Sequence, residues 1–203
     1  MNDKPWIVPP PALPISGNDA IAGTDARVSD FWQFAMSDLR MNNTRGYFAE
    51  FLVARALGLN NVTRVEWDAY DLLLGAVRIE VKSSAYLQAW EQRQLSRISF
   101  SGLRGTRYHP RYGYDTSGKG LNAHVYVFCV QTATSHRELD PLDVGQWAFY
   151  VVKRSALEKV AGASIGLDSV MRLATKDTSW NDLRKSVLDV AVGEEINDSI
   201  WWE

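Results

Sequence analysis

Apolar residues follow a helical spacing in two early stretches of the chain and a strand-like pattern in several later ones. Residues 30–39 and 44–57 carry apolar side chains three and four positions apart. This predicts two helices, the first capped by Ser29 and the second ended by Gly58. Runs rich in β-branched and aromatic residues predict strands at residues 62–67, 70–74, 76–82, 98–101, 124–131 and 146–152. Further helical patterns cover residues 83–95, 155–160 and 180–190.

Prolines crowd the start of the chain, where they predict an extended arm over residues 1–22, followed by a single domain over residues 23–203. The composition, with 46% hydrophobic and 23% charged residues among 203, is that of a globular domain. No apolar run approaches the roughly 18 residues that span a bilayer, and the start lacks the plan of a signal peptide. We therefore expect a cytoplasmic protein with no membrane partner.

The charge is unevenly distributed. The formal net charge of -2 argues against a protein that binds polyanions with its whole surface. The segment from Arg93 to Gly120 is nevertheless basic and rich in tyrosine. It holds a single acid, Asp115, against the basic residues Arg93, Arg97, Arg104, Arg107, Arg111 and Lys119. Arginines there would contact phosphates while tyrosines stack. The alternative is a surface loop whose tyrosines fold down over a small local core.

Candidate chemistry lies in the predicted hairpin of residues 70–82. Residues two apart on a strand point to the same side, so Glu80 and Lys82 share one face. A tight turn at Gly75 would bring Asp71 beside Glu80 on the neighbouring strand. The ordinary explanation of Glu80 and Lys82 is a cross-strand salt bridge worth about 0 to 1 kcal/mol.

A further carboxylate, Glu50, falls on the stripe of the second helix that should pack on the sheet. A buried carboxylate without a partner would be costly. Glu50 therefore needs backbone donors, a metal ion or a positive side chain, for which Arg45 and Arg55 are the candidates within its helix.

Two carboxylates that converge with a carbonyl oxygen form a hard oxygen site of the kind Mg²⁺ prefers. Asp71 and Glu80 would supply the carboxylates and Val81 the carbonyl. Lys82 would orient the attacking water or help to deprotonate it. This set of groups suits phosphodiester hydrolysis.

The order of a helix-borne Glu50, then Asp71, then Glu80-Val81-Lys82 on a strand resembles the PD-(D/E)XK nuclease superfamily. The resemblance covers about residues 44–92. It implies an α/β fold, a restriction-endonuclease-like αβββαβ core whose central mixed β-sheet is flanked by helices. It also implies that Asp71 and Glu80 are metal ligands, that Lys82 is catalytic and that Glu50 is an additional metal or water ligand.

The same resemblance brings Gln88 near the site. Two features depart from the superfamily's pattern: Tyr70 stands where the signature has proline, and Asp68 competes with Asp71 as the metal ligand. We prefer Asp71, because it would face the strand of Glu80 across a short turn.

We expect a Mg²⁺-dependent endonuclease, with Mn²⁺ able to substitute, that cleaves double-stranded DNA in restriction, phage defence or repair. The alternative is a non-catalytic DNA- or protein-binding module on the same fold, and a third interpretation is an ordinary α/β protein whose motif arose by chance. DNA or RNA as substrate, the number of metal ions and the oligomeric state stay open. A homodimer would supply the second catalytic centre for cutting both strands.

Overall fold

In the computed structural model the chain divides into two units, Met1–Ser37 and Asp38–Glu203. The structure describes residues 10, 13–60, 62–64, 69–109, 113–116, 118–160, 162–174 and 177–196. Much of the predicted N-terminal arm, residues 1–9, 11 and 12, lies outside the described residues. The arm therefore stays a prediction.

Among its described residues, the first unit contains one helix, α1 (Val28–Met36). It begins earlier than the predicted helix, with Arg27 rather than Ser29 as its N-cap. The reason is local: the Asp30 carboxylate accepts a hydrogen bond of 2.7 Å from the backbone N–H of Arg27. The Ser29 N–H instead donates to the carbonyl of Gly17.

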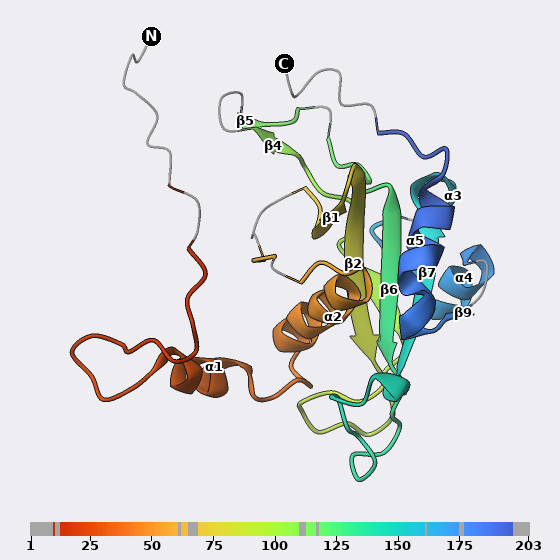
Figure 1. The fold of residues 1–203 in the computed structure, drawn as a ribbon. Helices are drawn as coiled ribbons and strands as arrows, with labels where there is room; N and C mark the ends of the chain where they lie inside the picture. The colour runs from red at the N-terminus through yellow and green to blue at the C-terminus, as the bar shows by residue number, and fades with distance from the viewer. Residues whose placement is uncertain are drawn as a thin grey trace. The chain divides into compact units, whose positions relative to one another are not determined.

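The second unit is built on a five-stranded mixed sheet in the order β1-β2-β6-β7-β9 (Figure 1). β2 and β6 are parallel, and the other neighbouring pairs are antiparallel. The strands are β1 (Leu72–Leu74), β2 (Val77–Ala85), β6 (Val125–Gln131), β7 (Trp147–Lys153) and β9 (Asp177–Thr178). The predicted mixed α/β class is thereby confirmed.

Helices cover both faces of this sheet. α2 (Asn42–Ala56) and α5 (Leu183–Ala191) pack on one face, around Val81, Val127 and Phe149. The other face carries a second apolar cluster around Phe128, to which α3 (Arg154–Glu158) and α4 (Leu167–Leu173) contribute. Smaller elements are β3 (Ser99–Ser101) paired with β8 (Ser164–Gly166), β4 (Tyr108–His109) paired with β5 (Gly113–Tyr114), and the 3₁₀ turns η1 (Val144–Gln146) and η2 (Trp180–Asp182).

β6 is buried along its whole length, because it lies inside the sheet and both of its faces are covered. Its side chains alternate between the two apolar clusters: Val127 and Cys129 belong to one, Phe128 and Val130 to the other. This explains why the sequence there reads as a continuous apolar run. Among the helices that the structure describes, none is both long and apolar enough to cross a membrane.

The helix predicted over residues 83–95 does not form, and this prediction was wrong. β2 continues through Ala85, because Ser83 and Ala85 pair with Cys129 and Gln131 of β6. The chain then runs without regular structure, held by the Gln92 side chain. Its amide oxygen accepts from the Gln88 N–H at 2.7 Å, and its amide nitrogen donates to the Tyr86 carbonyl at 3.1 Å.

This difference bears on the αβββαβ order, since the second helix of that core was expected at residues 83–95. The strand predicted over residues 62–67 is absent from residues 62–64, and residues 65–67 lie outside the described residues. α4, β8 and β9 were not predicted. The fold is therefore a helix-flanked mixed sheet, and the restriction-endonuclease-like core stays a prediction.

Candidate active site

The predicted hairpin is present as β1 and β2. Leu72 pairs with Ile79, and Leu74 pairs with Val77 across a two-residue turn. Gly75 occupies this turn with φ +60°, a conformation that side chains with a Cβ rarely adopt. The turn therefore fixes the register that brings the start of β1 beside the middle of β2.

Asp71 lies just before β1, at the edge of β2. Its backbone N–H donates to the Ile79 carbonyl at 3.0 Å, and its side-chain Oδ2 accepts from the Val81 N–H at 2.7 Å. The N–H and C=O of one strand residue point to the same edge. The Val81 carbonyl therefore faces the edge where Asp71 lies, as its predicted role as a ligand requires.

Glu80 and Lys82 lie together on β2, with Lys82 Nζ 2.6 Å from Glu80 Oε1. Ile79 and Val81 point into the cluster under α2, so Glu80 and Lys82 point to the other face of the sheet. Burial raises the pKa of Glu80 to about 7, and the charge of Asp71 adds to this effect while that of Lys82 opposes it.

Glu50 projects from α2 and pairs with Arg64, whose Nε lies 2.7 Å from Glu50 Oε2. Burial raises the pKa of Glu50, and the charge of Asp71 raises it further, against the effect of Arg64. Glu50 in turn contributes to the raised pKa of Glu80. The three predicted carboxylates therefore share one electrostatic environment.

Arg64 was not predicted as the partner of Glu50, since the candidates in the sequence were Arg45 and Arg55 of the same helix. Its guanidinium also lies over the Tyr47 ring, 4.5 Å from the centroid. Tyr47 and Glu50 are three residues apart on α2 and so present one face to Arg64. Nothing local in the sequence ties residue 64 to that face, because the contact is made by tertiary structure.

The donor set at this site consists of hard oxygen atoms. Within the described part of the chain, no group of three or more His, Cys, Asp and Glu side chains is close enough to hold a metal ion. Asp71, Glu80 and the Val81 carbonyl nevertheless suit Mg²⁺, because the charge of Asp71 raises the pKa of Glu80 and a cation would relieve this repulsion. Asp68, the competing ligand, lies outside the described residues.

Gln88 is buried and engaged in structural hydrogen bonds. Its Nε2 donates to the Ala85 carbonyl at 2.9 Å, and its Oε1 accepts from Arg45 Nη1 at 3.4 Å. It therefore anchors the segment after β2 to the start of α2.

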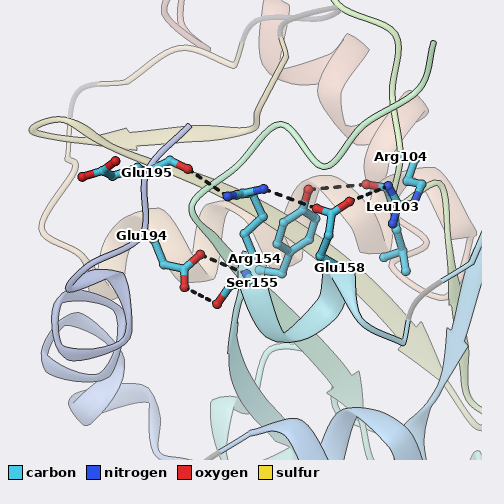
Figure 2. Close-up of polar contacts among 8 residues, drawn as sticks. Leu103, Arg104, Arg154, Ser155, Glu158, Glu194 and Glu195 are labelled. Carbon is cyan, nitrogen blue, oxygen red and sulfur yellow. Dashed lines mark hydrogen bonds and ion pairs between the residues drawn. The ribbon is translucent and has the colours of Figure 1, made fainter. Parts of the chain in front are cut away.

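The six predicted phosphate-binding cations have different surroundings. Arg104 pairs with Glu158 at 3.0 Å, and Glu158 also pairs with Arg154, which in turn donates to the Glu195 carbonyl (Figure 2). Arg107 lies 3.5 Å from the buried Asp115. Arg111 lies outside the described residues, and the side chains exposed to solvent are those of Arg93, Arg97 and Lys119.

The class that these observations define is a mixed α/β protein with interacting carboxylates and a lysine at a hairpin edge. Comparison with protein-family models, with curated proteins and with solved structures finds no match to this chain.

Proposed function

We propose that this protein is a Mg²⁺-dependent nuclease that hydrolyses phosphodiester bonds in DNA, similar to the PD-(D/E)XK enzymes. One observation carries the proposal: the charges of Asp71 and Glu50 both raise the pKa of Glu80, and Lys82 lies 2.6 Å from its carboxylate. Acidic side chains that interact electrostatically beside a lysine fit a site where a cation and a phosphate meet.

Each residue of the site would have a role that follows from its position. Asp71, Glu80 and the Val81 carbonyl would hold the metal ion, and Glu50 would hold a water ligand of that ion. A bound Mg²⁺ would supply positive charge to the scissile phosphate and the leaving oxygen. Lys82 would orient the attacking water and stabilise the hydroxide that forms from it. Its half-buried ammonium is held in place for this role by the ion pair with Glu80.

The test is cleavage of plasmid and linear DNA by the purified protein with Mg²⁺ or Mn²⁺, compared with EDTA. Asp71→Asn, Glu80→Gln and Lys82→Met should each lower the rate by about 100-fold or more, the scale of a lost acid, base or ligand. Circular dichroism should show that these variants stay folded.

The exposed pair Lys185 and Asp189 on α5 provides matched controls, because it too is an ion pair between a lysine and an acid. Lys185→Met and Asp189→Asn should leave cleavage unchanged. If cleavage survives Glu80→Ala and Lys82→Ala together, the site assignment fails.

A second candidate is a non-catalytic binding module, and the pairing of the acids favours it. Glu50 has Arg64, Glu80 has Lys82, and Asp71 accepts from the Val81 N–H. Titration with Mn²⁺ separates the two functions. Binding heat that vanishes in Asp71→Asn supports the nuclease, whereas absence of heat in the wild-type protein supports the module.

A further inference from the structure

Within the part of the chain that the structure describes, Arg45 is a buried cation without an acidic partner. It lies near the start of α2 and is 5% exposed. Its guanidinium donates to three neutral oxygens, on Arg40, Asn42 and Gln88, and its Nε has no hydrogen-bond partner. Burial accordingly lowers its pKa. A buried charge that no carboxylate neutralises leaves positive potential around it.

That potential lies beside a pocket of about 680 Å³. Gln88, which accepts from Arg45, is part of the pocket wall. The segment after β2 forms most of the rest, with Arg40 and His136 completing it. Three basic side chains, Arg40, Arg93 and His136, therefore line the pocket against one acid, Glu91, although Asp38 pairs with Arg40 at 2.8 Å.

Trp90 and Arg93 are among the exposed side chains that line the pocket. Trp90 is 56% exposed, an unusual state for so large an apolar surface, and Arg93 is exposed three residues further along. An indole face beside an exposed guanidinium is the combination that binds an unpaired base and its phosphate. Base stacking needs a base that is free of its complementary strand.

We propose that this pocket binds one nucleotide of a single-stranded segment, with the base on Trp90 and the phosphate on Arg93, while Arg45 supplies positive potential from behind. The inference rests on the proposed function and narrows it to substrates with unpaired nucleotides. From Lys82 to Ala85 the strand rises by roughly 10 Å. The pocket follows directly, so one strand of substrate could occupy both places.

The experiment measures binding in EDTA, so that cleavage plays no part. Fluorescence anisotropy of a labelled oligothymidylate gives the Kd for a single strand. Unlabelled duplex DNA and thymidine monophosphate are then added separately as competitors of the labelled strand. Trp90→Ala should raise the Kd about tenfold, whereas Trp90→Phe keeps a stacking face and should retain most of the affinity.

Arg93→Ala should weaken binding and reduce the slope of log K against log salt by about 0.7, the value for one phosphate contact of a single strand. Lys185→Ala on α5, outside the pocket wall, should change neither quantity. Arg45→Met, tested at a temperature where the protein is folded, should also weaken binding.

Single-strand binding that Trp90→Ala and Arg93→Ala leave intact would overturn the proposal, as would equal competition by duplex. Competition by the mononucleotide at a similar concentration would show that a free nucleotide, rather than a strand, is the ligand. Binding lost in Trp90→Ala without any nuclease activity would keep the pocket and reject the nuclease. If the protein cleaves DNA but these substitutions leave strand binding unchanged, the nuclease is kept and the pocket is rejected.

Discussion

At the scale of residues, the candidate site depends on where each charge is buried. Glu80 lies between the charge of Asp71, which disfavours its ionisation, and that of Lys82, which favours it. Burial and Asp71 prevail, so the pKa of Glu80 rises to about 7 from an ordinary value near 4.5. The folded protein therefore binds the Glu80 proton more tightly than the unfolded chain does.

This predicts a pH dependence of stability. A raised pKa in the folded state makes the contribution of Glu80 fall as the pH rises from about 4.5 to 7, after which it levels off. In Glu80→Gln this loss is absent. With EDTA present, the Tm of the variant relative to wild type should thus increase between pH 5 and pH 8. Glu138→Gln, an exposed change of the same kind, is the control, and a constant difference for Glu80→Gln would contradict the prediction.

Cys129 leads to a separate prediction. It is fully buried in β6, and burial raises the pKa of its thiol well above the ordinary range. Because the thiolate is the reactive form, iodoacetamide should label it only after unfolding. Mass spectrometry of protein treated in buffer and in guanidinium measures this. Labelling in buffer at the rate of the unfolded chain would show that the strand opens readily.

At the scale of elements, the sequence predicted what is encoded locally. The β1–β2 hairpin was predicted because Gly75 marks its turn and the runs on either side are of strand-favouring composition. The prediction of a helix over residues 83–95 was wrong for two reasons. Pairing with β6 extends β2, and the Gln92 side chain forms hydrogen bonds with backbone groups of the segment that follows. Both effects depend on residues distant in sequence or on one side chain's conformation, which helical spacing does not report.

The role of Gln92 can be tested directly. Gln92→Ala removes the acceptor for the Gln88 N–H and the donor to the Tyr86 carbonyl and to Ser96 Oγ. We expect a loss of about 1 to 3 kcal/mol in the free energy of unfolding. Urea denaturation measures it, with Gln94→Ala, an exposed glutamine of the same segment, as the control. Equal stability of the two variants would mean that Gln92 does not hold this segment.

At the scale of the whole molecule, the apolar clusters belong to one of the two units. Their buried residues fall between Ala49 and Val187, and none of the described residues of the unit Met1–Ser37 belongs to them. Arg64 and Glu50 illustrate why the sequence alone could not complete the site. They are 14 residues apart and meet only when the second unit folds.

Removal of residues 1–37 is therefore expected to leave a cooperatively folded chain. Its Tm should lie within about 4 °C of the full-length value, equivalent to about 1 kcal/mol for a chain of this size. Differential scanning calorimetry of the chain over residues 38–203 measures this. A broad transition or a larger fall would show that the first unit supports the core.

The parallel pairing of β2 with β6 also has a consequence for synthesis. β2 ends at Ala85, but its partner β6 begins only at Val125. The two strands therefore cannot pair until about forty further residues have been translated. During that interval its apolar side chains lack their neighbours on β6, and contacts so distant in sequence form slowly. The nascent chain would then be vulnerable to aggregation at this stage, and its yield in cells should depend on chaperones that cover unfinished sheets.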